Sequence, residues 1–80
     1  MKRRIHVDYN TIEIDDPRQK VYIDTYSEPE LLEILCNGLS VVLYDHESLE
    51  VNAVAEYDEE TKQWYGIPDW PTSRDLPRIQ

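Results

Sequence analysis

Phenylalanine is absent from this 80-residue sequence, and cysteine and glycine are nearly so. The single cysteine, Cys36, excludes a disulfide within the chain, which favours a reducing compartment. Gly38 and Gly66 are the only glycines, so there is no glycine-rich loop to cradle a phosphate group. The basic start MKRRIHVDYN has no apolar stretch behind it, and no apolar run approaches the ~20 residues of a membrane-spanning helix. We therefore expect a cytoplasmic protein with no signal peptide and no membrane span.

Basic residues are missing from the middle of the chain. Between Asp24 and Thr61 there is no Lys or Arg, and the net charge of the whole chain is −9. The acidic residues of that window are Asp24, Glu28, Glu30, Glu33, Asp45, Glu47, Glu50, Glu56, Asp58, Glu59 and Glu60. Such a surface repels nucleic acid and anionic membranes, which are bound through Lys and Arg, and attracts basic proteins. We expect no nucleic-acid or membrane partner. A basic protein partner and solubility alone remain two explanations of the charge.

A chain of this length provides apolar material for one domain only. Six tyrosines and two tryptophans supply all the aromatic bulk, and their rings can be buried while a polar tip stays wet. The last residues contain several prolines and no alternation of apolar and polar residues. We therefore predict a single domain over residues 1–68, and an extended C-terminal tail over residues 69–80 that packs on it.

Alternating apolar residues predict strands at the beginning of the chain, over residues 5–9 and 12–14 and again over 21–23. The apolar positions change parity between Tyr9 and Ile12, which a bulge or a break absorbs. Pairing Ile12 with Ile23 places Ile14 opposite Val21 and brings opposite charges together. This pattern predicts an antiparallel hairpin.

The segment SEPELLEILCNG, residues 27–38, has the features of a helix. Ser27 and Glu30 have the spacing of a capping box, and Gly38 is suited to end the helix. The apolar residues that fall on one side are Leu31, Leu32, Ile34, Leu35 and Cys36. We therefore predict a helix packed on the sheet, with the Cys36 thiol buried as a structural group rather than a reactive one.

Three further strands are predicted over residues 39–45, 49–57 and 63–68, the first two pairing with Leu43 opposite Leu49. The predicted fold is therefore α+β. It is a small antiparallel sheet in the chain order strand, strand, helix, strand, strand, strand, with one helix packed on one face.

No motif of the sequence carries a defined chemistry. The loop Asp45-His46-Glu47, together with His6, contains donor types that bind divalent metals, but adjacent residues rarely converge on one ion and these residues also suit a tight loop. We assign no metal site, no cofactor and no catalytic residue. The alternative that remains is a small-ligand-binding protein or minor enzyme, with a pocket between the helix and the C-terminal tail.

The aromatic residues give the main functional hypothesis. If Tyr65 and Ile67 face the helix, Trp64 faces the opposite side of the sheet, because neighbours along a strand alternate. The predicted interaction surface consists of Tyr44, Glu50, Glu56, Asp58, Trp64 and Trp70. The favoured function is a small acidic, non-enzymatic interaction module that binds a basic protein, and the same face would serve a homodimer. Two interpretations stay open, an exposed patch or a patch covered by the tail.

Overall fold

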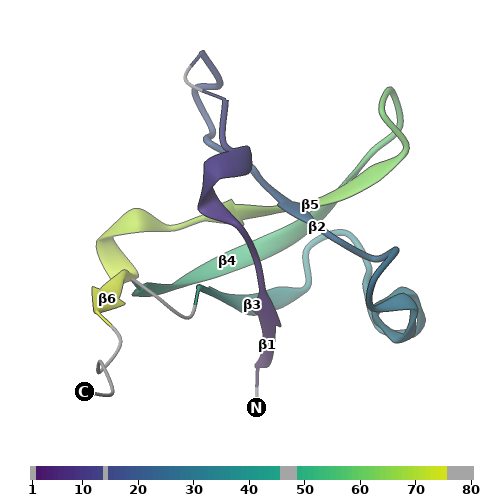
Figure 1. Cartoon of the computed structure of the whole chain (residues 1–80), viewed down its shortest axis with the longest axis horizontal. Coiled ribbons are helices and arrows are strands. Elements are labelled where there is room, and N and C mark those ends of the chain that lie inside the picture. The colour runs from purple at the N-terminus through teal and green to yellow at the C-terminus, as the bar shows by residue number, and fades with distance from the viewer. Residues whose placement is uncertain (1, 14, 46–48, 76–80) are drawn as a thin grey trace.

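The computed structural model describes residues 2–13, 15–45 and 49–75, which form one sheet of six strands and three short 3-10 turns. In chain order the elements are β1 (Arg3–His6), η1 (Tyr9–Thr11), β2 (Val21–Ile23), η2 (Pro29–Glu33), β3 (Ser40–Tyr44), β4 (Leu49–Asp58), β5 (Gln63–Pro68), η3 (Trp70–Thr72) and β6 (Arg74–Asp75). The strand order across the sheet is β1-β3-β4-β5-β2, and β6 pairs with β4. The sheet curls into a half-barrel around the core (Figure 1).

The predicted α+β fold is wrong, because the segment expected to be a helix forms only η2. No helix of seven or more residues occurs in the described part of the chain. Ser27 is not the N-cap: its hydroxyl donates to the carboxylate of Asp24, and Glu28 occupies the cap position without a side-chain bond. A helix of this length is marginal by itself, and one tight turn already buries Leu31 and Leu35. Burial of these two side chains therefore requires a single turn and not a longer helix.

The predicted hairpin between residues 12–14 and 21–23 is also wrong, because Ile12 and Glu13 belong to no strand. β1 pairs in parallel with β3, whereas β2 pairs antiparallel with β5 at the other edge of the sheet. The chain crosses between these edges through η1, where the carboxylate of Asp8 accepts the N–H of Asn10 at 2.9 Å. The apolar positions change parity between Tyr9 and Ile12 because the chain forms this 3-10 turn there, and not a bulge within a strand. Ile14, which the predicted hairpin paired with Val21, lies outside the described residues.

The predicted pairing of the third and fourth strands is confirmed, but with a shifted register. Leu43 lies opposite Val51 rather than Leu49. A shift of two residues keeps every side chain on its face of the sheet, so the faces are as expected. The inner face and η2 supply the core, which consists of Ile5, Val7, Val21, Ile23, Leu31, Leu35, Val41, Leu43, Val51, Ala53 and Ala55.

The chain after β5 continues along the same edge of β4. The N–H of Asp69 donates to the carbonyl of Asn52 at 2.8 Å, and the N–H of Asn52 donates to Thr72 Oγ1 at 3.0 Å. Beyond η3, β6 pairs with the beginning of β4, with Arg74 opposite Glu50. Residues 69–75 are thus held to β4 by main-chain and side-chain bonds.

Candidate functional site

Trp64 lies on the inner face of the sheet, and its predicted outward orientation is wrong. The register of β4 and β5 sets Trp64 opposite Tyr57 and Gly66 opposite Ala55, which is buried in the core. The rings of Trp64 and Tyr57 are tilted, with centroids 5.3 Å apart. The prediction assumed that Ile67 faces the core, but Ile67 pairs with Val54 on the outer face. One wrong assignment of parity reverses every residue of a strand.

Trp70 also packs against the core cluster and not on the outer face. Its ring lies 6.1 Å from the ring of Tyr9, measured between centroids. The indole N–H of Trp70 is buried, with no hydrogen-bond partner among the described residues. Both tryptophans are therefore removed from the predicted outer interaction surface, and each contacts a different tyrosine.

Tyr44 lies on the outer face, as predicted. The ring of His6 meets the ring of Tyr44 edge-on, with their centroids 5.4 Å apart. The guanidinium carbon of Arg4 lies 4.5 Å from the centroid of the Tyr44 ring. Two valines of this face differ in burial: Val42 is buried, while Val54 is 41% exposed. Among the described residues of this face, no other large hydrophobic side chain is as exposed as Val54. Tyr44, Tyr65 and Ile67 of the same face are half-buried.

The three predicted acidic residues all lie on the outer face of β4, and each is engaged by a basic residue of the same chain. Glu50 accepts from Arg4 Nη2 at 3.2 Å and from Arg74 Nε at 2.7 Å. Arg18 donates to both carboxylate oxygens of Glu56, with Nη1 to Oε1 at 2.8 Å. Lys20 Nζ lies 3.0 Å from Asp58 Oδ2. These carboxylates are therefore much less available to a partner than the sequence suggested.

The pairs also hold the carboxylates in their ionised form. The hydrogen bond from Arg18 lowers the pKa of Glu56 below its ordinary value. The hydrogen bond from Lys20, followed by those from the N–H groups of Glu60 and Thr61, lowers the pKa of Asp58. Such exposed pairs contribute little free energy each, so their main effect is to neutralise the outer face.

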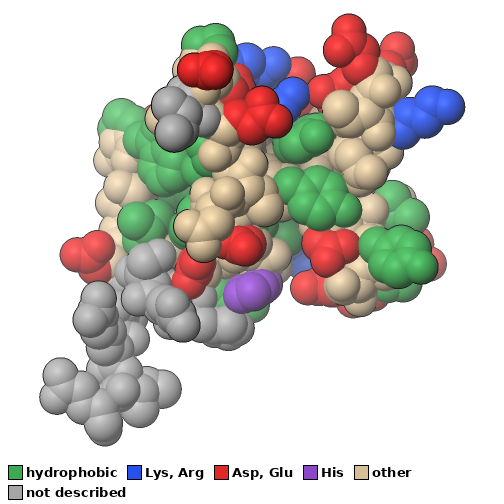
Figure 2. Space-filling model, turned by 45° about the horizontal axis from the view of Figure 1, so that its top comes forward, with side chains coloured by type: hydrophobic (Ala, Val, Ile, Leu, Met, Phe, Trp, Pro, Cys, Tyr) green, Lys and Arg blue, Asp and Glu red, His purple; other side chains and the backbone are tan. Residues whose placement is uncertain are grey.

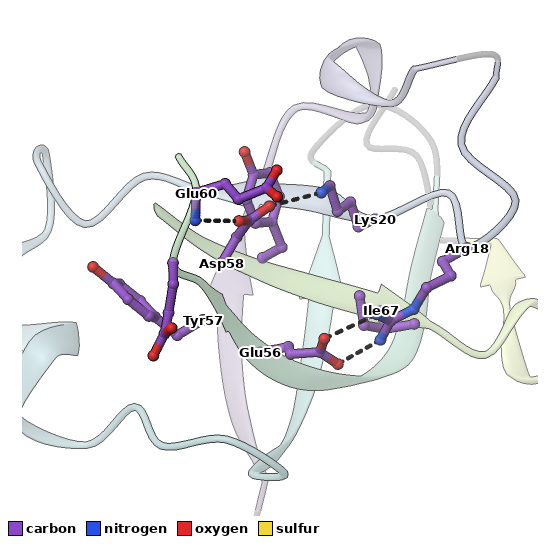
Figure 3. Close-up of a pocket in the computed structure, with 9 residues that line it drawn as sticks. Arg18, Lys20, Glu56, Tyr57, Asp58, Glu60 and Ile67 are labelled. Atoms are coloured by element: carbon purple, nitrogen blue, oxygen red, sulfur yellow. Dashed lines mark hydrogen bonds and ion pairs between the residues drawn. The ribbon is translucent and has the colours of Figure 1, made fainter. Parts of the chain in front are cut away.

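Two of these pairs border a groove of about 260 Å³ at the end of β4 and β5 (Figure 3). Tyr65 and Ile67 give it an apolar lining, and the ammonium group of Lys20 lies 4.6 Å from the centroid of the Tyr65 ring. A ligand that competed for the cations would have to break pairs already formed with Glu56 or Asp58. No residue that lines this groove comes from η2 or from residues 69–75, where the sequence predicted a ligand pocket.

A second surface was not recognised from the sequence. We call residues 24–37 the η2 projection, because this segment stands out from the sheet (Figure 1). Its exposed hydrophobic side chains are Tyr26, Leu32 and Ile34, which are 93%, 56% and 43% exposed. Hydrophobic and acidic side chains lie side by side on the right-hand lobe of the molecule, where Figure 1 places η2 (Figure 2). Cys36 is exposed too, so its predicted burial is wrong.

The beginning of the η2 projection is fixed by Asp24. Its carboxylate accepts the N–H groups of Tyr26 and Ser27, each at 3.1 Å, and the Ser27 hydroxyl at 2.8 Å. The hydrogen bonds from Ser27 are the main cause that lowers the pKa of Asp24. The sequence contained a signal for this surface: LLEILC has more apolar residues than one narrow helical stripe can bury.

Three further findings concern metal ligands, membrane-spanning helices and similarity to known proteins. The described residues contain no group of three potential metal ligands, and His46 and Glu47 lie outside them. Within the part of the chain that the structure covers, no helix has the length and apolar character to cross a membrane. No family model, no curated protein and no solved structure matches the chain significantly.

Proposed function

We propose that this protein is a non-enzymatic interaction module that binds a basic protein partner in the cytoplasm. The distribution of its charge supports this function. The paired basic residues of the described chain are Arg4, Arg18, Lys20 and Arg74, and all of them contact the acidic residues of β4. The carboxylates of Glu28, Glu30 and Glu33 in the η2 projection form no ion pair among the described residues and add to the negative field.

One observation carries the proposal: the η2 projection exposes hydrophobic side chains in a stretch that has acidic residues and no basic ones. Leu32 and Ile34 lie on either side of Glu33 in the chain, and Glu30 precedes Leu32 by two residues. The charges would speed the encounter with a basic protein and orient it. Desolvation of the apolar side chains would then supply affinity. Solubility alone accounts for the acidic residues but not for exposed Leu32 and Ile34.

The same charge argues against other macromolecular partners. Nucleic acids and anionic membranes are bound by arrays of Lys and Arg, and the paired basic residues are already committed to Glu50, Glu56 and Asp58. We therefore retain the expectation of a protein partner, with no nucleic-acid and no membrane partner.

The test is capture from an extract of the native cells by immobilised protein, at low and at high salt. The proposal predicts that basic proteins are retained at low salt and released at high salt, because the attraction is screened. A control column carries a variant in which Glu28, Glu30 and Glu33 are replaced by lysine. No retention of basic proteins by the wild-type column at low salt, or retention that is unaffected by salt, would argue against the proposed function, whereas equal retention by both columns would place the contact outside residues 24–37.

A further inference from the structure

We propose that the η2 projection is the contact surface, and that it receives a basic amphipathic segment of the partner. This inference rests on the proposed function and adds to it the site and the form of the ligand. The segment would place an apolar stripe on Leu32 and Ile34 and its lysines or arginines beside the flanking carboxylates.

The burial pattern of η2 explains why hydrophobic side chains remain outside. Leu31 and Leu35 are 1% and 8% exposed, and they anchor the turn in the core. Leu32 and Ile34 lie between these two residues in the chain and remain exposed. Leaving them in water forgoes apolar burial in a domain with a small core. A partner that covers both would recover that free energy.

The carboxylates of the projection restrict the chemistry of the partner. Glu28, Glu30 and Glu33 form no ion pair among the described residues, in contrast to Glu50 and Glu56. A purely apolar partner would have to desolvate these charges without compensation. A segment with lysine or arginine beside its apolar stripe pairs with them instead, which favours a basic amphipathic ligand.

The projection is held at both ends, so that little ordering is needed on binding. The Asp24 carboxylate fixes its beginning, as described above. At its end, Asn37 Oδ1 accepts the N–H of Tyr57 at 2.7 Å, and the N–H of Gly38 donates to the carbonyl of Ala55 at 2.9 Å. A surface that is ordered before binding loses less conformational entropy when the partner docks.

The test is a titration of the ¹⁵N-labelled protein with a synthetic amphipathic helix of leucine and lysine at low salt. We expect amide shifts confined to residues 24–37, and Leu32→Ser and Ile34→Ser should each weaken binding about tenfold. Val54→Ser on the outer face is the matched control, because Val54 is 41% exposed and Ile34 is 43% exposed. The control should bind within about twofold of wild type.

Three outcomes would overturn the inference: no binding of the peptide, shifts centred on residues 59–62, or equal weakening by Val54→Ser. None of them removes the proposed function, which depends on the salt-dependent capture of basic proteins from the extract. Failure of that capture, in turn, removes the function whatever the peptide does. Leu32 and Ile34 are exposed, and two separate variants guard against a folding defect in one of them.

Discussion

Gly38 and Gly66 are needed for different physical reasons. Gly38 has a φ of +90°, in the region that L-residues avoid, although a side chain there would meet open space. Gly66 has an ordinary backbone, but an added Cβ would lie 2.7 Å from a methyl carbon of Leu43. The first glycine turns the chain from η2 into β3, and the second allows β5 to pack on the core.

We predict that Gly38→Ala lowers the free energy of unfolding by about 1–2 kcal/mol through backbone strain. Gly66→Ala should lower it by about 1–3 kcal/mol through overpacking against Leu43. Gly38→Asn is the control that separates the causes, because asparagine tolerates positive φ and should lose less than alanine. Urea denaturation measures all three. A neutral Gly38→Ala would show that the turn into β3 differs from the one described.

The ionisation of Tyr9 is strongly altered by its surroundings. Its hydroxyl lies 3.2 Å from the carbonyl oxygens of both Leu43 and Leu49, to either of which it can donate. Burial, and then the negative charges of Asp45 and Glu50, raise the pKa of Tyr9 to about 12. The folded state therefore holds this proton more tightly than the unfolded chain, in which tyrosine has its ordinary pKa of about 10.

We predict that Tyr9→Phe costs about 1 kcal/mol near neutral pH, through the lost hydrogen bond. Because the folded pKa is raised, the contribution of protonated Tyr9 is complete below pH ~10 and is lost as pH rises towards 12. The stability difference between wild type and Tyr9→Phe should therefore shrink over that interval. Denaturation at several pH values measures it, and a constant difference up to pH ~12 would contradict the burial of the hydroxyl.

At the scale of elements, local signals predicted the strands better than their partners. The alternation of Val51, Ala53 and Ala55 gave β4 and its buried face correctly. The parallel pairing of β1 with β3 joins residues such as Ile5 and Leu43, and no local pattern indicates such a contact. The predicted hairpin of residues 12–14 with residues 21–23 failed in the same way, since the partner of β2 is the distant strand β5.

The beginning of the η2 projection provides a test at this scale. The sequence suggested that Ser27 caps a helix, whereas in the structure the Asp24 carboxylate holds the turn that precedes η2. We predict that Asp24→Ala lowers stability more than Ser27→Ala does, because Asp24 accepts three hydrogen bonds and Ser27 contributes two of them. Thermal denaturation compares the two variants. A larger loss in Ser27→Ala would favour the longer helix predicted from the sequence.

At the scale of the molecule, the position of the acidic residues could be predicted from the sequence, but the ion pairs that neutralise them could not. The sequence placed Glu50 and Glu56 on the outer face of a strand, and the structure agrees, while Asp58, expected in the following turn, is the last residue of β4. Their basic partners are between 24 and 46 residues away in sequence, which a pattern of neighbours cannot indicate. Of the residues of the predicted interaction surface, Tyr44 and the three acids therefore lie on the outer face, and both tryptophans pack against the core.

The molecule thus divides its carboxylates between two roles. Those of β4 pair with basic residues of the same chain and join the tail and the N-terminal half to the sheet. Those of the η2 projection surround exposed hydrophobic side chains and, in the proposed function, meet the partner. The two groups can be separated experimentally, because three carboxylates can be neutralised in each while Asp24, which holds the turn before η2, is left in place.

The most direct measurement is the affinity of the leucine and lysine peptide for two triple variants. One carries Glu50→Gln, Glu56→Gln and Asp58→Asn, and the other carries Glu28→Gln, Glu30→Gln and Glu33→Gln. Each removes three negative charges, so that the net charge changes equally, from −9 to −6. We predict that the η2 variant binds at least about tenfold more weakly, while the β4 variant binds within about twofold of wild type. Equal weakening of the two variants, or a larger loss in the β4 variant, would contradict the assignment of the partner to the η2 projection.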